Sequence, residues 1–125
     1  MSIPTDRRYL PSHEWFKLEG STVVMGITQF AADELTDITF VSLPKVGASF
    51  KAGGVIGEVE SVKATSEIFT GVSGEVVEVN AALNQHPEAV NDDAFGRGWM
   101  IKLKASNPAE LNGLLTAEQY GAKIA

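Results

Sequence analysis

Apolar residues alternate with polar ones in short runs along most of this chain, and the runs end at glycine or proline. The clearest run spans residues 37–43 (Asp-Ile-Thr-Phe-Val-Ser-Leu) and is closed by Pro44. Two further runs begin at glycines, at 54–60 and 74–79, and a pair at 15–19 and 22–25 is separated by Gly20-Ser21. Period-two alternation between regular turns is typical of strands in β sandwiches and barrels. The pattern therefore predicts a mostly β fold with a hairpin near residues 15–25.

Helical signals occur in only two places. Thr28 is a suitable N-cap for a short helix, inserted near 28–35. Near the C-terminus, the order Asn-Pro-Ala-Glu at 107–110 is typical of a capped helix start. Leucines at 111, 114 and 115 then fall on one helical stripe. We expect a C-terminal helix near 108–120, with Thr116 capping its last turn and Gly121 ending it.

Length and composition favour one compact unit. The chain has 125 residues and 44% apolar residues, without a Pro/Ala or Gly/Ser linker or a low-complexity segment. We therefore expect a single domain over 1–125, with a core at about 20–103 and a helical tail at about 106–125.

The charge and the cysteine content exclude several function classes. A net charge of −6 without any basic run disfavours nucleic acid as a partner. The absence of cysteine excludes disulfides and thiol nucleophiles, and two histidines are too few for a zinc site. The first residues lack the apolar segment of a secretory signal, and no apolar run is long enough to span a bilayer. These features predict a soluble protein in the cytoplasm, or in the mitochondrial matrix of a eukaryote, without a membrane partner. We also expect a monomer, although these features do not determine the oligomeric state.

Other short motifs carry no catalytic prediction. Ser12, His13 and Glu14 are triad residue types, but neighbours on a strand point to opposite faces and form no relay. We expect His13 to pack beside Trp15 or to face solvent. Residues 91–93 (Asn-Asp-Asp) lack the spacing of a calcium loop and predict a polar turn.

Lys63 occupies a special place in the pattern. Alternation stops on both sides of it, which puts it on a hairpin turn between two strands, with its amine in solvent. Two similar glycine-led strands, at 53–60 and 71–79, flank it. The small neighbours Ser61, Ala64 and Ser66 leave room for a modifying enzyme and for an attached arm. Acylation of this amine turns a charged ammonium into a neutral amide.

The segments around Lys63 resemble the lipoyl domain family, whose members are flattened barrels of two small sheets with a modified lysine on an exposed hairpin. Matching segments are 43–47 (Leu-Pro-Lys-Val-Gly), 60–64 (Glu-Ser-Val-Lys-Ala) and 73–76 (Ser-Gly-Glu-Val). The flanks at 12–15 (Ser-His-Glu-Trp), 37–41 and 98–102 (Gly-Trp-Met-Ile-Lys) further resemble the H proteins of the glycine cleavage system. Biotin carriers typically have methionines beside their lysine, whereas here Val62 and Ala64 flank it.

This resemblance implies a carrier and not an enzyme. Lys63 would hold lipoate as lipoyllysine, and Glu60, Ser61, Val62 and Ala64 would serve recognition by the lipoylating enzyme. The arm would take an aminomethyl group from glycine at a pyridoxal-phosphate decarboxylase, the P protein. It would pass the group to the tetrahydrofolate-dependent aminomethyltransferase, the T protein, and electrons to dihydrolipoamide dehydrogenase, the L protein. The disulfide chemistry then belongs to the cofactor, which suits a chain without cysteine.

The family pattern also implies a cleft that shelters the cationic, hydrolysable cargo, with Glu14, Glu34 and Glu67 as its candidate residues. Two departures affect this region. Thr36 replaces a glycine that is usual in the family, which puts a turn there in doubt, and residues 29–35 lack a histidine that some members carry. Two alternatives remain open from the sequence: a relay that hands lipoate to other enzymes, and an H-like interaction domain without lipoate.

Overall fold

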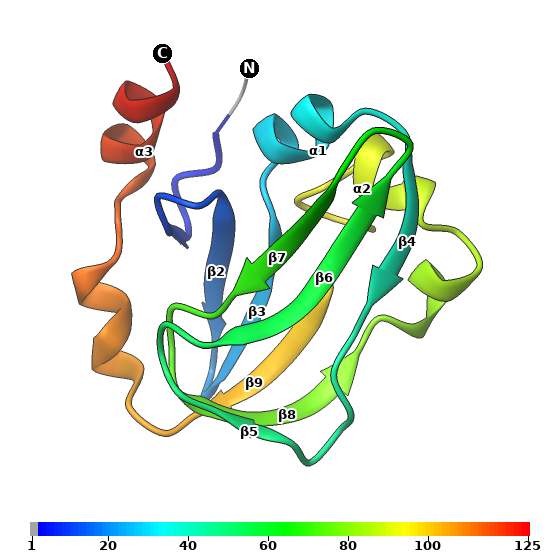
Figure 1. The fold of residues 1–125 in the computed structure, drawn as a ribbon. Coiled ribbons are helices and arrows are strands. Elements are labelled where there is room, and N and C mark those ends of the chain that lie inside the picture. Colours follow the sequence, from blue (N-terminus) through cyan, green and yellow to red (C-terminus); the bar gives the residue numbers. More distant parts are fainter. Residues whose placement is uncertain (1–2) are drawn as a thin grey trace.

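Two antiparallel sheets face each other in the computed structural model, which describes residues 3–125 (Figure 1). The larger sheet has the order β1-β2-β3-β9-β8-β5, with β1 at Arg8–Tyr9, β2 at Glu14–Glu19, β3 at Thr22–Ile27, β9 at Ile101–Ala105, β8 at Gly74–Val79 and β5 at Ser49–Phe50. The smaller sheet has the order β4-β6-β7, with β4 at Ile38–Ser42, β6 at Val55–Ser61 and β7 at Thr65–Phe69. The predicted mostly β fold of two sheets is confirmed, as an open sandwich and not a closed barrel.

The main core lies between these two sheets. The six-stranded sheet contributes Phe16, Val23 and Met25, and the three-stranded sheet contributes Val59 and Ile68, all of them at most 1% exposed. Strand β6 buries Ile56 and Val59 and exposes Glu58 and Glu60, as its alternating sequence predicts. The two similar strands noted around Lys63 are β6 and β8, and they lie in different sheets. The division into a core of about 20–103 and a tail stays a prediction, although the larger sheet begins earlier, at β1.

The short inserted helix is confirmed as α1, Gln29–Leu35, with the Thr28 side chain accepting from the Ala31 N–H. Residues 80–93 differ from the prediction. They form a 3₁₀ turn at Ala81–Asn84 and the helix α2 at Glu88–Asp92, so the polar turn expected at 91–93 is wrong. The Asn91 side chain binds backbone groups of the neighbouring α1–β4 connection, and sequence periodicity does not reveal such a long-range contact.

The C-terminal segment is helical in two pieces instead of one. A 3₁₀ helix spans Pro108–Gly113, the chain is extended at Leu114, and α3 spans Ala117–Ile124. The expected cap at Asn107 is wrong, because the Glu110 carboxylate that was to complete it accepts from Ser73 instead. Thr116 and Gln119 form a capping box at the start of α3. Gly121 does not end this helix.

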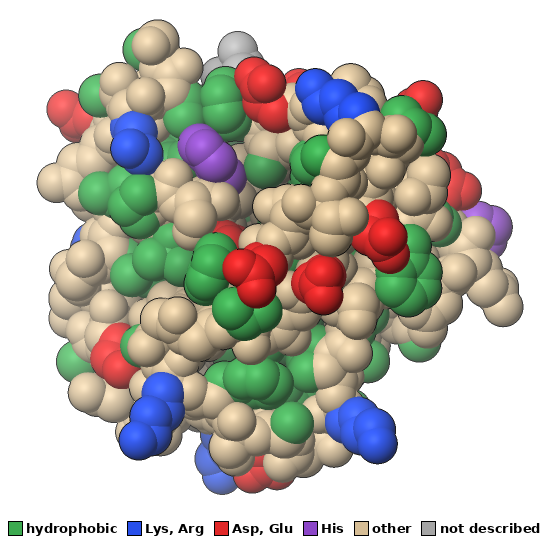
Figure 2. Space-filling model, in the orientation of Figure 1, with side chains coloured by type: hydrophobic (Ala, Val, Ile, Leu, Met, Phe, Trp, Pro, Cys, Tyr) green, Lys and Arg blue, Asp and Glu red, His purple; other side chains and the backbone are tan. Residues whose placement is uncertain are grey.

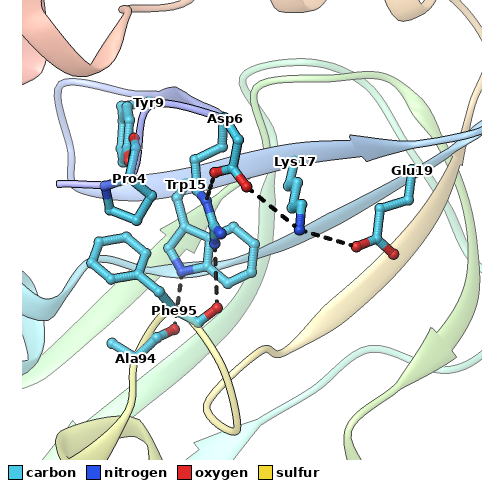
Figure 3. A network of polar contacts seen from close by, with 9 residues as sticks. Pro4, Asp6, Tyr9, Trp15, Lys17, Glu19, Ala94 and Phe95 are labelled. Carbon is cyan, nitrogen blue, oxygen red and sulfur yellow. Dashed lines mark hydrogen bonds and ion pairs between the residues drawn. The ribbon is translucent and has the colours of Figure 1, made fainter.

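A second apolar cluster joins the N- and C-terminal segments. Figure 3 shows its Tyr9, Trp15 and Phe95 side chains together with the polar contacts around them. Trp15 is buried and donates its indole N–H to the Ala94 carbonyl at 3.1 Å. Arg7 lies over the Trp15 ring and donates to the Phe95 carbonyl. Tyr9 donates its hydroxyl to the Pro4 carbonyl at 2.6 Å and stacks on Tyr120 of α3, with ring centroids 4.8 Å apart. This cluster holds α3 against the larger sheet.

Thr36 occupies a turn that favours glycine. Its φ of 62° and ψ of −144° lie in a region that side chains with a Cβ rarely adopt. Asn91 holds this turn from α2: its Nδ2 donates to the Thr36 carbonyl at 2.7 Å, and its Oδ1 accepts from the Ile38 N–H at 3.0 Å. The turn that the sequence put in doubt is therefore present.

Replacing Thr36 by glycine should stabilise the protein by about 1 kcal/mol, because the relieved backbone strain exceeds the entropy that glycine adds to the unfolded chain. Urea unfolding measures this change. Thr36→Ala is the matched control: it removes the side chain but keeps the Cβ, and we expect it to stay within about 0.5 kcal/mol of the parent. Equal stabilisation by both variants would show that the backbone is not the cause.

Candidate functional site

Lys63 lies at the tip of the β6–β7 hairpin, as predicted, and its side chain is exposed. The Ser61 hydroxyl organises this tip: it accepts from the amides of Lys63 and Ala64 at 3.3 and 3.1 Å and donates to the Ala64 carbonyl at 3.2 Å. The Val62 amide donates to the Asp37 carbonyl at 3.1 Å, and its side chain is 68% exposed. The tip is therefore a fixed backbone platform that presents the Lys63 amine to solvent.

The outer face of the hairpin is acidic. Glu60 lies opposite Phe40 of β4 and Thr65 of β7, and Glu58 lies opposite Glu67. All three glutamates are exposed, and Figure 2 shows acidic side chains gathered over this face. The exposed ring of Phe40 borders them. A partner that approaches Lys63 from this side meets negative charge before it meets the amine.

A groove of about 430 Å³ starts beside the hairpin, and we call it the α1 groove. Its walls are the turn before β2, helix α1 and the start of β7, through Ser12, His13, Phe30, Ala31, Glu34, Leu35 and Ser66. Ser66 lies on β7, three residues from Lys63, and three residues of chain span at most roughly 11 Å. The α1 groove is therefore within reach of a lysine side chain lengthened by an acyl chain.

Glu14 lies behind the Ser12 side of this groove and is 1% exposed. One carboxylate oxygen accepts from the Ser12 hydroxyl at 2.5 Å, and the other accepts from the Phe69 N–H at 2.8 Å. This carboxylate thus links the larger sheet to β7 of the smaller one. Burial raises the pKa of Glu14 to about 7, because the two hydrogen bonds only partly offset the loss of hydration.

Of the other two predicted cleft residues, the structure brings only Glu34 to the α1 groove, while Glu67 faces outward on β7. His13 was expected beside Trp15 or in solvent, and that prediction is wrong. Its ring lines the groove, 5.0 Å from the Phe30 ring, and its Nδ1 is 2.8 Å from the Tyr120 hydroxyl. Burial and the nearby Lys123 lower the pKa of His13, with Glu34 opposing them, so the ring is neutral at neutral pH.

No periodic signal in the sequence reveals the position of His13, because its φ of 78° breaks the strand alternation before β2 begins. Tyr120 has no such signal for a different reason: it belongs to α3 and is distant from the groove residues in sequence. Strands β5 and β8 lie at the end of the molecule away from the tip of the β6–β7 hairpin (Figure 1). A larger hollow of about 650 Å³ is lined by residues of β5, β8 and β9 and their flanks. It contains no residue of the hairpin tip or of α1, so it is not part of this site.

A two-sheet sandwich that presents one exposed lysine on a fixed hairpin tip, next to a mostly apolar groove, defines a carrier domain of the lipoyl type. The sequence comparisons narrow this class. The family model for the glycine cleavage H-protein matches residues 7–125, and the chain belongs to this family. Members of the family carry lipoate on a lysine and are carriers, not catalysts.

Individual relatives agree with the family match. The chain is 53% identical to the glycine cleavage system H protein of Opitutus terrae over 121 residues, 96% of this chain and 95% of the relative. It is 51% identical to that of Geobacillus kaustophilus, over 99% of this chain and 98% of the relative. A crystal structure of the glycine cleavage system H protein from Mycobacterium marinum superposes with a TM-score of 0.89 at 38% identity, covering 98% of both chains.

In the part of the chain that the structure describes, no helix is both long and apolar enough to cross a membrane.

Proposed function

We propose that Lys63 is the lipoyl attachment site of this chain and that the α1 groove receives the loaded arm. The observation that carries the proposal is the position of Lys63: it is exposed at a fixed hairpin tip, three residues from a groove wall at Ser66. The bound lipoyl group would supply a disulfide that is reduced when it accepts the cargo, which the protein itself cannot do without cysteine.

The groove residues fit such an arm. Phe30, Ala31 and Leu35 form an apolar surface suited to an acyl chain, and Ser12 and Ser66 are small polar residues at its edges. The amide that joins lipoate to Lys63 is neutral, so the attached chain enters this surface without burying the lysine charge.

Three carboxylates favour a cationic aminomethyl cargo. Glu34 lines the α1 groove, and Glu14 lies behind Ser12 in a buried position where charge interactions are little screened. Glu67 is exposed on β7 and acts at longer range. We assign to Glu14 and Glu34 the role of sheltering the cargo once it lies in the groove. We assign to Glu67 the role of attracting the cationic cargo as it approaches the groove.

The exposed face of the hairpin serves the partners. Glu60, Ser61, Val62 and Ala64 form the surface next to Lys63 that the lipoylating enzyme recognises. Glu60 contributes negative charge to it, and Ser61 fixes the backbone of the tip. We infer three further partners, by family membership: the pyridoxal-phosphate decarboxylase, the tetrahydrofolate-dependent aminomethyltransferase and dihydrolipoamide dehydrogenase. The relatives named above are bacterial, which supports a cytoplasmic location for a monomeric carrier.

Glycine–bicarbonate exchange with the decarboxylase tests the glycine role. We expect the lipoylated protein to support exchange and the bare protein to support almost none, because the decarboxylase needs the arm to accept the aminomethyl group. If the protein is instead a relay that hands lipoate to other enzymes, it will become lipoylated but will support no glycine–bicarbonate exchange. If it is an H-like interaction domain without lipoate, its mass will not increase after treatment with a lipoylating enzyme. Either result would contradict the proposed function. A separately purified H protein of known activity serves as the positive control.

A further inference from the structure

The hydroxyl of Tyr120 joins three elements around the α1 groove. It lies 2.8 Å from the His13 Nδ1 and 2.7 Å from the Thr28 hydroxyl. Tyr120 belongs to α3, His13 to the turn before β2, and Thr28 is the N-cap of α1. The C-terminal helix therefore contacts both walls of the groove through one oxygen atom.

The directions of these hydrogen bonds form a consistent chain. A neutral His13 with its proton on Nε2 accepts at Nδ1 from the Tyr120 O–H. The Tyr120 oxygen then accepts from the Thr28 O–H, and the Thr28 oxygen accepts from the Ala31 N–H at 3.2 Å. None of the buried side-chain polar atoms in this network lacks a partner, and Tyr120 and Thr28 are both about 1% exposed. Such buried, fully satisfied networks fix side-chain positions.

The groove walls depend on the two groups that Tyr120 holds. The His13 ring contacts the Phe30 ring, and both line the groove. Thr28 starts α1, which supplies Phe30, Ala31, Glu34 and Leu35 to the groove lining. His13 has a positive φ of 78°, a conformation that surrounding contacts must maintain. Loss of the Tyr120 hydroxyl would release the His13 ring and the N-terminus of α1 together.

We infer that Tyr120 is a positioning residue for arm docking: its hydroxyl sets the spacing of the His13 and α1 walls, so α3 controls how well the α1 groove shelters the cargo. This inference rests on the proposed role of the groove. It gives the C-terminal helix a function beyond packing. A phenylalanine ring at position 120 would fill the same space, so the hydroxyl of Tyr120 is needed only for its hydrogen bonds to His13 and Thr28.

Tyr120→Phe tests the inference, with Tyr9→Phe as the matched control. Tyr9 stacks on Tyr120 in the same cluster, but its hydroxyl binds the Pro4 carbonyl and not the groove (Figure 3). The first measurement uses the bare protein: the ¹⁵N shifts of the His13 ring report its tautomer. We expect Tyr120→Phe to move these shifts toward the mixture of tautomers seen for free histidine, and Tyr9→Phe to leave them unchanged.

The second measurement uses lipoylated protein loaded with the aminomethyl group. Water attacks the cargo carbon, the carbon–sulfur and carbon–nitrogen bonds break, and the products are thiol, formaldehyde and ammonium. We expect formaldehyde release to be roughly fivefold faster in Tyr120→Phe, the change expected for one lost positioning hydrogen bond, and unchanged in Tyr9→Phe. Parent rates in Tyr120→Phe, or equal acceleration in both variants, would overturn the inference.

His13→Phe reaches the same hydrogen bond from its other end and keeps a ring against Phe30. We expect the double variant with Tyr120→Phe to release formaldehyde no faster than either single variant, whereas additive effects would contradict the inference. If the parent protein releases formaldehyde as fast as free aminomethyl-dihydrolipoamide, the groove proposal itself fails. In that case, the histidine shifts still decide whether Tyr120 positions His13.

Discussion

Replacing Lys63 by arginine should abolish lipoylation while leaving the fold intact. Lipoate attachment needs a neutral amine that attacks an activated acyl group, and a guanidinium is never deprotonated under these conditions. Arginine keeps the positive charge and the solvent exposure of the hairpin tip. The Ser61 hydrogen bonds that shape this tip involve only backbone groups of residue 63, so they survive the change.

Intact-mass spectrometry after co-expression with a lipoylating enzyme measures this prediction. The parent should gain one lipoyl group, and Lys63→Arg should gain none and support no glycine–bicarbonate exchange. Lys51→Arg, at another exposed position, is the control and should be lipoylated like the parent. A lipoyl mass gain on Lys63→Arg would show that another amine is the acceptor.

Replacing Glu14 by glutamine should stabilise the protein above neutral pH and weaken shelter of the cargo. The raised pKa of about 7 means that the folded state holds a proton more tightly than the unfolded chain, whose carboxyl group has a pKa near the ordinary 4.5. Folding stability contributed by the protonated form is therefore lost as pH rises from about 4.5 to about 7. The difference between a pKa of 4.5 and a pKa of about 7 corresponds to at most about 3.4 kcal/mol of stability.

Glutamine removes this pH-dependent cost because it is neutral at every pH. Its carbonyl accepts from the Phe69 N–H, and its amide donates to the Ser12 hydroxyl, so both contacts of Glu14 are retained. We expect Glu14→Gln to be about 1–3 kcal/mol more stable than the parent at pH 8.5 and close to it at pH 4.5, by urea unfolding. Glu75→Gln, at an exposed position on β8, should change little at either pH.

At pH 8.5, where Glu14 of the parent is ionised, the same variant should release formaldehyde faster from the loaded arm, because the buried negative charge near the cargo is gone. Greater stability combined with weaker shelter would identify Glu14 as a group kept for function at a cost to folding. A loss of stability at pH 8.5 would instead show that the two hydrogen bonds of the ionised carboxylate outweigh its burial.

Elements that depend on residues close together in the sequence were predicted correctly, whereas elements that depend on contacts between distant residues were not. The hairpin of β2 and β3 and the strands β4, β6 and β8 were predicted because alternation and turn residues act within a few positions. Helix α1 was predicted from its cap at Thr28. The C-terminal helix was predicted as one piece because the leucines at 111, 114 and 115 fit a stripe, yet Glu110 binds Ser73, from a distant strand, and the chain breaks at Leu114.

The sequence by itself determined the β architecture, the hairpin that carries Lys63 and the resemblance to the family, since each depends on local pattern or on ordered motifs. Only the tertiary structure decided what surrounds the hairpin. It placed His13 in the α1 groove, buried Glu14 between the sheets and brought Tyr120 from α3 to both groove walls. These contacts join residues up to 107 positions apart, and no periodicity along the chain records a contact of that range.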